Sequence, residues 1–161
     1  MNTIYKLLQE DEISEITYFI KQKQLSPHTY LNGIGPTITL PLLRYMLFNN
    51  LVYVYGSYIS NNLTNLSIIL YPKAGSSSTA LEAIFLSLDH DFIDFLCKSL
   101  LSPPISNGEK QFTKVKILLS EQQHQSLFVE LKESGFIEEL SLTAYADDEN
   151  LHFWSRYLGE E

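Results

Sequence analysis

The sequence Ser126-Leu-Phe-Val-Glu-Leu-Lys-Glu-Ser-Gly-Phe136 decides the fold. Its apolar residues recur at spacings of three and four, which predicts the packed face of a helix over residues 121–134. Gly135 stands where a helix commonly ends in a residue with positive φ. From residue 136 to residue 145 the side chains favour a strand. The order helix, Gly135-Phe136, strand therefore indicates a domain that mixes both kinds of element.

Similar patterns continue on both sides of this stretch. Further helices are expected over residues 11–24, 37–49 and 89–101. Further strands are expected over residues 3–8, 51–60, 66–71, 79–86, 114–119 and 151–158. The Asn61-Asn62 pair suits a hairpin turn, and the order of elements over residues 79–145 suits parallel crossovers. The fold class expected is α+β (mixed α/β): one domain over residues 1–161, with a central mixed antiparallel and parallel sheet of about six to seven strands and about four helices.

Composition excludes several classes of protein. Hydrophobic residues make up 45% and charged residues 19%, which is typical of a globular chain and not of a disordered one. The N-terminus lacks the basic and apolar runs of a signal peptide, and no apolar stretch reaches the roughly 20 residues that cross a bilayer. The single cysteine, Cys97, cannot form an internal disulfide and reads as a core residue. We therefore expect a cytoplasmic protein without a membrane segment.

The charge is negative and unevenly distributed. A net charge of −8 argues against binding to nucleic acid, which needs clustered Lys and Arg. Residues 121–161 hold ten acids against Lys132 and Arg156. This end suits a cationic substrate or partner; the alternative is a solvated surface that keeps the protein in solution. The sequence leaves open whether the chain is a monomer or a homodimer.

The opening stretch resembles the penultimate helix of the GNAT superfamily of acyl-CoA-dependent N-acyltransferases, which ends in x-Tyr-Glu-Lys-x-Gly-Phe. Ile137-Glu-Glu-Leu140 and the closing strand to Leu158 fit it too, and Tyr5–Glu12 is similar to the family's opening strand and first helix. The resemblance implies a GNAT-like fold, acetyl-CoA as cosubstrate, and an amine of a small molecule or a protein as acceptor. The alternative function is a GNAT-like fold without coenzyme A binding that serves as a binding or regulatory module.

The sequence departs from the family's pattern at two places. In the family, the turn after the strand at residues 79–86 reads Arg/Gln-x-x-Gly-x-Gly/Ala and holds the coenzyme A pyrophosphate. Here residues 87–94 contain no glycine and three acids. Tyr30–Gly35 has glycines at a similar spacing, but no clear strand precedes it, so a plain loop is the favoured interpretation. Leu131 replaces the tyrosine that the family often uses to protonate the departing thiolate.

Two side chains are candidates for acid–base chemistry. Glu82 is the expected base, because a place on the central strand would bury it in part; the alternative is a solvated carboxylate. His124, seven positions before Leu131, corresponds to a polar residue of the family and is the candidate acid. A packed or surface histidine is the alternative for His124. No cluster of Cys and His predicts a metal site.

The resemblance also implies cofactor-binding positions. The backbone of Phe85, Leu86 and Ser87 is expected to hold the pantetheine arm, and His90, in the phosphate turn, is counted with them. Helix capping is the alternative for His90, with Asp89 or Asp91 as the capping residue. An aromatic acceptor pocket is a further hypothesis, with ordinary sheet packing as its alternative. The tyrosines concerned are Tyr30, Tyr45, Tyr53, Tyr55, Tyr58 and Tyr71.

Overall fold

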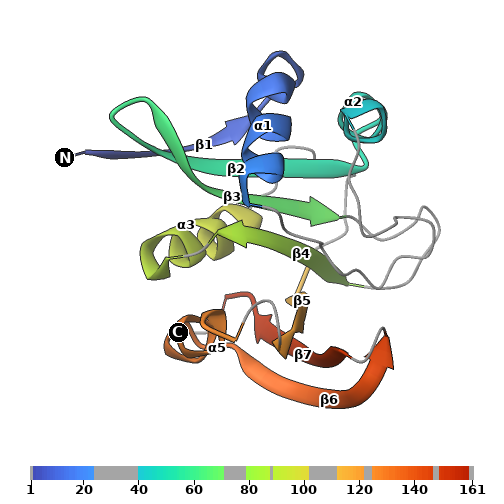
Figure 1. The fold of residues 1–161 in the computed structure, drawn as a ribbon. Helices are drawn as coiled ribbons and strands as arrows, with labels where there is room; N and C mark the ends of the chain where they lie inside the picture. Colours follow the sequence, from blue (N-terminus) through green and yellow to red (C-terminus); the bar gives the residue numbers. More distant parts are fainter. Residues whose placement is uncertain are drawn as a thin grey trace.

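The computed structural model describes residues 2–23, 40–70, 79–87, 89–101, 112–121, 125–146 and 149–159. In this part of the chain seven strands form one sheet, and helices pack on both of its faces (Figure 1). The strands are β1 (Thr3–Leu8), β2 (Val52–Ile59), β3 (Asn62–Leu70), β4 (Ala80–Ser87), β5 (Lys114–Ser120), β6 (Ile137–Ala146) and β7 (Glu149–Tyr157). The helices are a 3₁₀ turn η1 (Glu10–Glu12), α1 (Ile13–Lys23), α2 (Leu40–Phe48), α3 (His90–Leu100) and α5 (Leu127–Glu133). The mixed α/β fold predicted from the sequence is confirmed.

The strands lie in the order β1-β2-β3-β4-β5-β7-β6, and every neighbouring pair is antiparallel except β4 and β5. The parallel crossover predicted over residues 79–145 is confirmed for β4, α3 and β5. It is wrong for the strand after α5, because β7 lies between β5 and β6. β6 therefore pairs antiparallel with β7 at the edge of the sheet.

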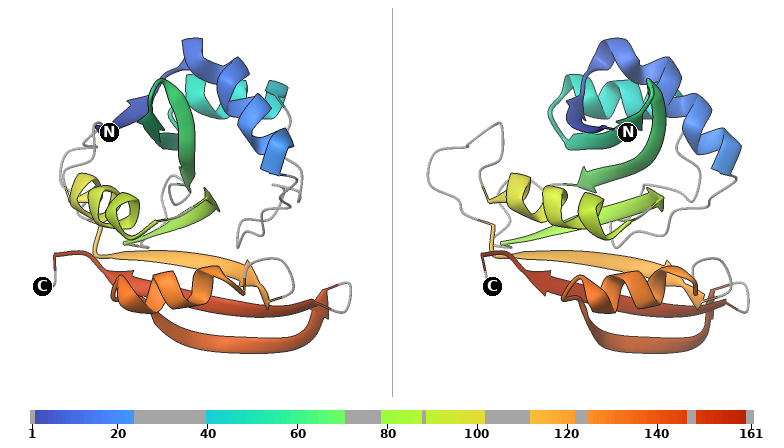
Figure 2. Two further views of the ribbon diagram at one scale, coloured as in Figure 1. Left: turned by 60° about the vertical axis from the view of Figure 1, so that its left-hand side comes forward. Right: turned by 90° about the vertical axis from the view of Figure 1, so that its left-hand side faces the viewer.

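The two parallel strands pair over a short distance and then separate. Residues 80–83 of β4 are in register with residues 114–117 of β5. Beyond them, residues 84–87 continue along β3 and residues 118–120 continue along β7. Figure 2 shows β4 and β5 moving apart toward their C-terminal ends. We call this region, between residues 84–87 and residues 118–120, the β4–β5 split.

Side chains that alternate along the strands enter two separate cores. Val52 and Val54 of β2 pack in the core with α1 and α2. Tyr53 and Tyr55 of the same strand pack in the other core, with α3 and α5. The inward side chains of β5 and β7, such as Trp154, belong to this second core. Each face of the sheet is therefore covered by its own pair of helices.

The stretch at the end of α5 folds as its sequence predicts. Gly135 has a φ of +84°, which side chains with a Cβ rarely adopt. The Gly135 N–H donates to the Lys132 carbonyl (3.1 Å), and the Phe136 N–H donates to the Leu131 carbonyl (2.9 Å). This pair of bonds is the Schellman motif, and both Leu131 and Phe136 are buried beside it. The helix stop at Gly135 is confirmed.

The hairpin turn differs from its prediction by one residue. Ser60 and Asn61 form the turn, with φ values of +50° and +64°, and β3 begins at Asn62. A tight hairpin of this kind needs positive φ at both central residues, and the chain uses Ser60 where Asn62 was expected. Helix α5 begins at Leu127; residue 121, where the predicted helix starts, is also helical, and residues 122–124 between them lie outside the described part of the chain.

Candidate functional site

At the β4–β5 split, one edge of β4 has no neighbouring strand among the described residues. Phe85, Leu86 and Ser87 belong to β4, and their strand pairs with β3 on one side. On the other side, no strand of the described part of the chain is in register with residues 84–87. Such an edge offers backbone donors and acceptors to an extended ligand. The contact of Phe85, Leu86 and Ser87 with a pantetheine arm stays a prediction.

Glu82 lies two positions before the split. Only 5% of its surface is exposed, so the alternative of a solvated carboxylate is wrong. It stands opposite Leu70 of β3 and Lys116 of β5. Because Leu81 and Ala83 belong to the core under α3 and α5, the side chain of Glu82 lies on the other face of the sheet. The role of Glu82 as a base stays a prediction.

Polar side chains continue from Glu82 across the same face. Lys116 is in register with Ser155 of β7, and the Ser155 hydroxyl donates to Glu139 Oε1 at 2.5 Å. Lys114 Nζ donates to the same oxygen at 2.5 Å. The hydrogen bonds from Lys114 and Ser155 lower the pKa of Glu139. We call Glu82, Lys116, Ser155 and Glu139 the polar strip.

Asp89 closes the beginning of α3. It is the N-cap residue, and its Oδ1 accepts the backbone N–H of Phe92 at 2.7 Å. Its Oδ2 accepts Nδ2 of Asn65 at 2.7 Å. Asn65 is buried and also donates to the Ser57 hydroxyl at 2.9 Å. The prediction that Asp89 or Asp91 caps this helix is confirmed for Asp89.

His90 is the first residue of α3 and is exposed. Its Nδ1 lies 2.9 Å from the Ser134 hydroxyl, and its Nε2 lies 3.5 Å from Asp94 Oδ2. The alternative of helix capping at this turn is confirmed, with Asp89 and not His90 as the capping residue. Its contact with a cofactor stays a prediction. The ring joins the first turn of α3 to the end of α5.

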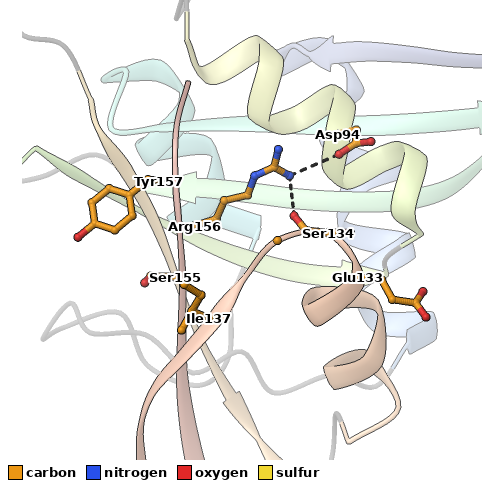
Figure 3. A pocket seen from close by; sticks show the side chains of 8 residues that line it. Asp94, Glu133, Ser134, Ile137, Ser155, Arg156 and Tyr157 are labelled. Carbon is orange, nitrogen blue, oxygen red and sulfur yellow. Dashed lines mark hydrogen bonds and ion pairs between the residues drawn. The ribbon is translucent and has the colours of Figure 1, made fainter. Parts of the chain in front are cut away.

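A pocket of about 330 Å³ borders this junction (Figure 3). Arg156 Nη1 donates to the Ser134 carbonyl at 2.7 Å and lies 3.4 Å from Asp94 Oδ1. Figure 3 shows the guanidinium reaching both groups, while the ring of Tyr157 points away from them. Arg156 therefore ties β7 to α3 and to the end of α5. The sequence did not indicate this tie, because its three members are far apart along the chain.

His152 of β7 lies between two carboxylates. Its Nδ1 contacts Glu138 Oε1, and its Nε2 lies 3.2 Å from Glu121 Oε2. Burial lowers the pKa of His152, but the hydrogen bonds with Glu138 and Glu121 outweigh it, so that the pKa is raised. The ring of Phe128 packs edge-on against the imidazole of His152, with the two ring centroids 4.8 Å apart. Sequence reasoning missed this cluster, since the pairing of β7 with both β5 and β6 brings its members together.

Other sequence predictions have mixed outcomes. Cys97 is buried, and burial raises the pKa of its thiol to about 11, so the core interpretation is confirmed. The tyrosines do not form one pocket: Tyr53 and Tyr55 lie in the core under α3, Tyr58 lies in the core under α1, and Tyr45 is exposed. Three predictions lie outside the described residues, namely those on His124, on Tyr71 and on the glycine-containing segment that begins at Tyr30.

No group of three or more His, Cys, Asp or Glu side chains in the described ranges could hold a metal ion. No helix among these residues is long and apolar enough to span a membrane.

No protein family model matches the sequence, and no curated protein matches it. Solved structures resemble the fold over almost the whole chain. A GNAT-family acetyltransferase from Streptococcus pneumoniae has 11% identity and a TM-score of 0.74, covering 98% of this chain and 100% of that chain. An N-acetyltransferase from Staphylococcus aureus Mu50 has 12% identity and a TM-score of 0.71, with 99% and 100% covered. Spermidine N-acetyltransferase from Vibrio cholerae, in complex with CoA and spermine, has 12% identity and a TM-score of 0.65, with 97% and 95% covered.

Proposed function

Since this chain has the fold of the GNAT acetyltransferases, we propose that it transfers an acyl group from a pantetheine thioester to an amine. The observation that carries the proposal is the β4–β5 split with the buried Glu82 beside it. A strand edge without a neighbour is suited to hold an extended donor. A buried carboxylate two residues away is suited to act on the acceptor.

The residues present fit one half of acetyl-CoA and not the other. The free edge of residues 84–87 fits the pantetheine arm, because the amides of the arm can pair with peptide groups. The beginning of α3 does not fit the pyrophosphate, because Asp89 already accepts the N–H of Phe92 and adds a negative charge. No step of the proposed reaction therefore depends on the nucleotide.

Glu82 supplies the base in this proposal. An amine attacks only as the free base, so the carboxylate of Glu82 takes up the proton that the amine gives away. The carbon–nitrogen bond forms, the carbon–sulfur bond breaks, and the leaving sulfur takes a proton from water. Leu131 cannot donate this proton, because its side chain is a buried hydrocarbon. Lys116 lies opposite Glu82 in register on the neighbouring strand.

The acceptor is an amine of a small molecule or of a protein. An amine carries a positive charge near neutral pH; in the polar strip the carboxylates of Glu82 and Glu139 are balanced by Lys116 and Lys114, so the strip itself does not select the charge of the acceptor. The negative charge of the chain as a whole favours the approach of such an acceptor. This net charge supports a cationic acceptor over an anionic one.

The test is turnover of acetyl thioesters with a panel of amines, followed by release of the thiol. Glu82→Gln should bind the donor as well as the unaltered protein in calorimetry while losing about 100-fold or more in turnover, the range expected for a missing general base. Glu10→Gln makes the same change of charge at an exposed position in η1 and should leave turnover unchanged. Equal turnover of Glu82→Gln and the unaltered protein would remove Glu82 from the mechanism.

A second function is favoured by the cap at α3. Asp89 in place of an open phosphate turn is also what a GNAT-like binding module without catalysis would carry. The two functions differ in donor binding. If neither acetyl-CoA nor acetyl-pantetheine at millimolar concentration raises the melting temperature, the transferase proposal fails and the binding module is favoured.

A further inference from the structure

We infer that the donor is recognised through its acyl group and pantetheine arm alone, and that the nucleotide half of coenzyme A gains no affinity from this chain. The inference rests on the proposed transferase function and narrows its donor class. The donor is an acyl thioester of pantetheine, either free or carried on a protein. Three properties of the segment between β4 and α3 lead to this conclusion.

The first property is length. β4 ends at Ser87 and α3 begins at His90, so two residues join them. A phosphate cradle is a loop in which several successive N–H groups turn toward one anion. Of the two joining residues, Asp89 is the N-cap and is already committed to the helix. The connection is therefore too short to wrap around a pyrophosphate.

The second property is occupancy of the helix start. The Phe92 N–H, which an incoming phosphate would need, donates to Asp89 Oδ1 at 2.7 Å. The other oxygen of Asp89 is held by Asn65 Nδ2 at 2.7 Å, and Asn65 is itself fixed by Ser57 at 2.9 Å. Asn65 and Ser57 are both buried. Asp89 cannot rotate away without depriving a buried amide of a partner, so the cap is a fixed part of the protein.

The third property is charge. Asp89 and Asp91 are exposed in the first turn of α3, and Asp94 follows in the next turn. The Arg156 guanidinium contacts Asp94 and donates to the Ser134 carbonyl. Carboxylates beside an anionic pyrophosphate repel it and offset the favourable field of the helix N-terminus. The edge of β4 is not altered by these features.

The primary experiment compares ligands on the intact chain by calorimetry, a readout that does not need turnover. Coenzyme A, pantetheine and adenosine 3′,5′-bisphosphate are titrated separately. We expect coenzyme A and pantetheine to bind with dissociation constants within about tenfold of each other, and the bisphosphate not to bind at millimolar concentration. Coenzyme A binding more than about tenfold tighter than pantetheine would overturn the inference and leave the transferase proposal intact. Binding of neither would overturn both.

Two further experiments test why the nucleotide gains no affinity and which kind of thioester is the donor. Raising the salt concentration should strengthen the binding of coenzyme A relative to that of pantetheine, because screening weakens the repulsion of the pyrophosphate by Asp89 and Asp91. The opposite trend would contradict the inference. Asp91→Asn should also strengthen the binding of coenzyme A relative to that of pantetheine, and it leaves the Asp89 cap in place. Lys98→Gln, in the last turn of α3, is the control that should not strengthen the relative binding of coenzyme A. Turnover of acetyl-pantetheine, free or attached to a carrier protein, then identifies which source of the thioester is used.

Discussion

Replacing Asp89 by Ala should destabilise the fold far more than an exposed acidic residue normally would. The Phe92 N–H loses its acceptor, and losing an N-cap costs about 1 kcal/mol. The buried Asn65 also loses a hydrogen bond to a charged group, worth about 1.5–3 kcal/mol, although its bond to Ser57 remains. We therefore expect a loss of about 2.5–4 kcal/mol in the free energy of unfolding, or about 5–16 °C in Tm for a chain of this size.

The assay is urea denaturation followed by circular dichroism, with Asp91→Ala as the matched control. Asp91 lies in the same turn and carries the same charge, so its loss should cost only the helix-dipole contribution of about 0.3–1 kcal/mol. An Asp89→Ala variant no less stable than Asp91→Ala would refute the reasoning. A double-mutant cycle with Asn65→Ala adds a second check, because strictly additive losses would mean that Asp89 and Asn65 do not interact.

Two further changes test the ends of α5 and β7. Gly135→Ala should cost about 1–2 kcal/mol in chemical denaturation, because the φ of +84° is unfavourable for a residue with a Cβ, while the added Cβ would make only an ordinary contact with Arg156 at 3.8 Å. Gly135→Asn should cost less. His152 has a raised pKa, so its stabilising contribution is complete below its unfolded pKa and is lost as the pH rises through the folded one. The stability advantage over His152→Gln should therefore shrink from pH 6 to pH 8.5, and an advantage independent of pH would contradict this.

Local patterns predicted most of the elements, because each depends on neighbours in the sequence. The stop at Gly135 follows from one residue that tolerates positive φ, and the cap at Asp89 follows from its position before an apolar helix. The position of β7 did not follow, because an alternating strand pattern specifies a face and not a neighbour. The hairpin turn moved by one residue since Ser60 adopted a conformation that sequence statistics assign to Asn.

The candidate site was predictable only in part. Glu82 was found because a place on the central strand predicted its partial burial, and the observed burial agrees with that prediction. Lys116, Asn65 and Arg156 were missed, because their importance depends on which residues lie opposite or above them in the folded sheet. No pattern in a single sequence reports a contact between residues that are tens of positions apart.

The short register between β4 and β5 also divides the sheet into two parts. Residues 3–87 supply β1 to β4, and residues 114–157 supply β5 to β7. The two parts of the sheet are joined by the residue pairs at 80–83 of β4 and 114–117 of β5. The core under α3 and α5 contains side chains from both parts of the sheet. A ligand bound in the β4–β5 split would contact both parts of the sheet and would fix the angle between them. Without a ligand, that angle depends on the residue pairs between β4 and β5 and on the core that both parts share.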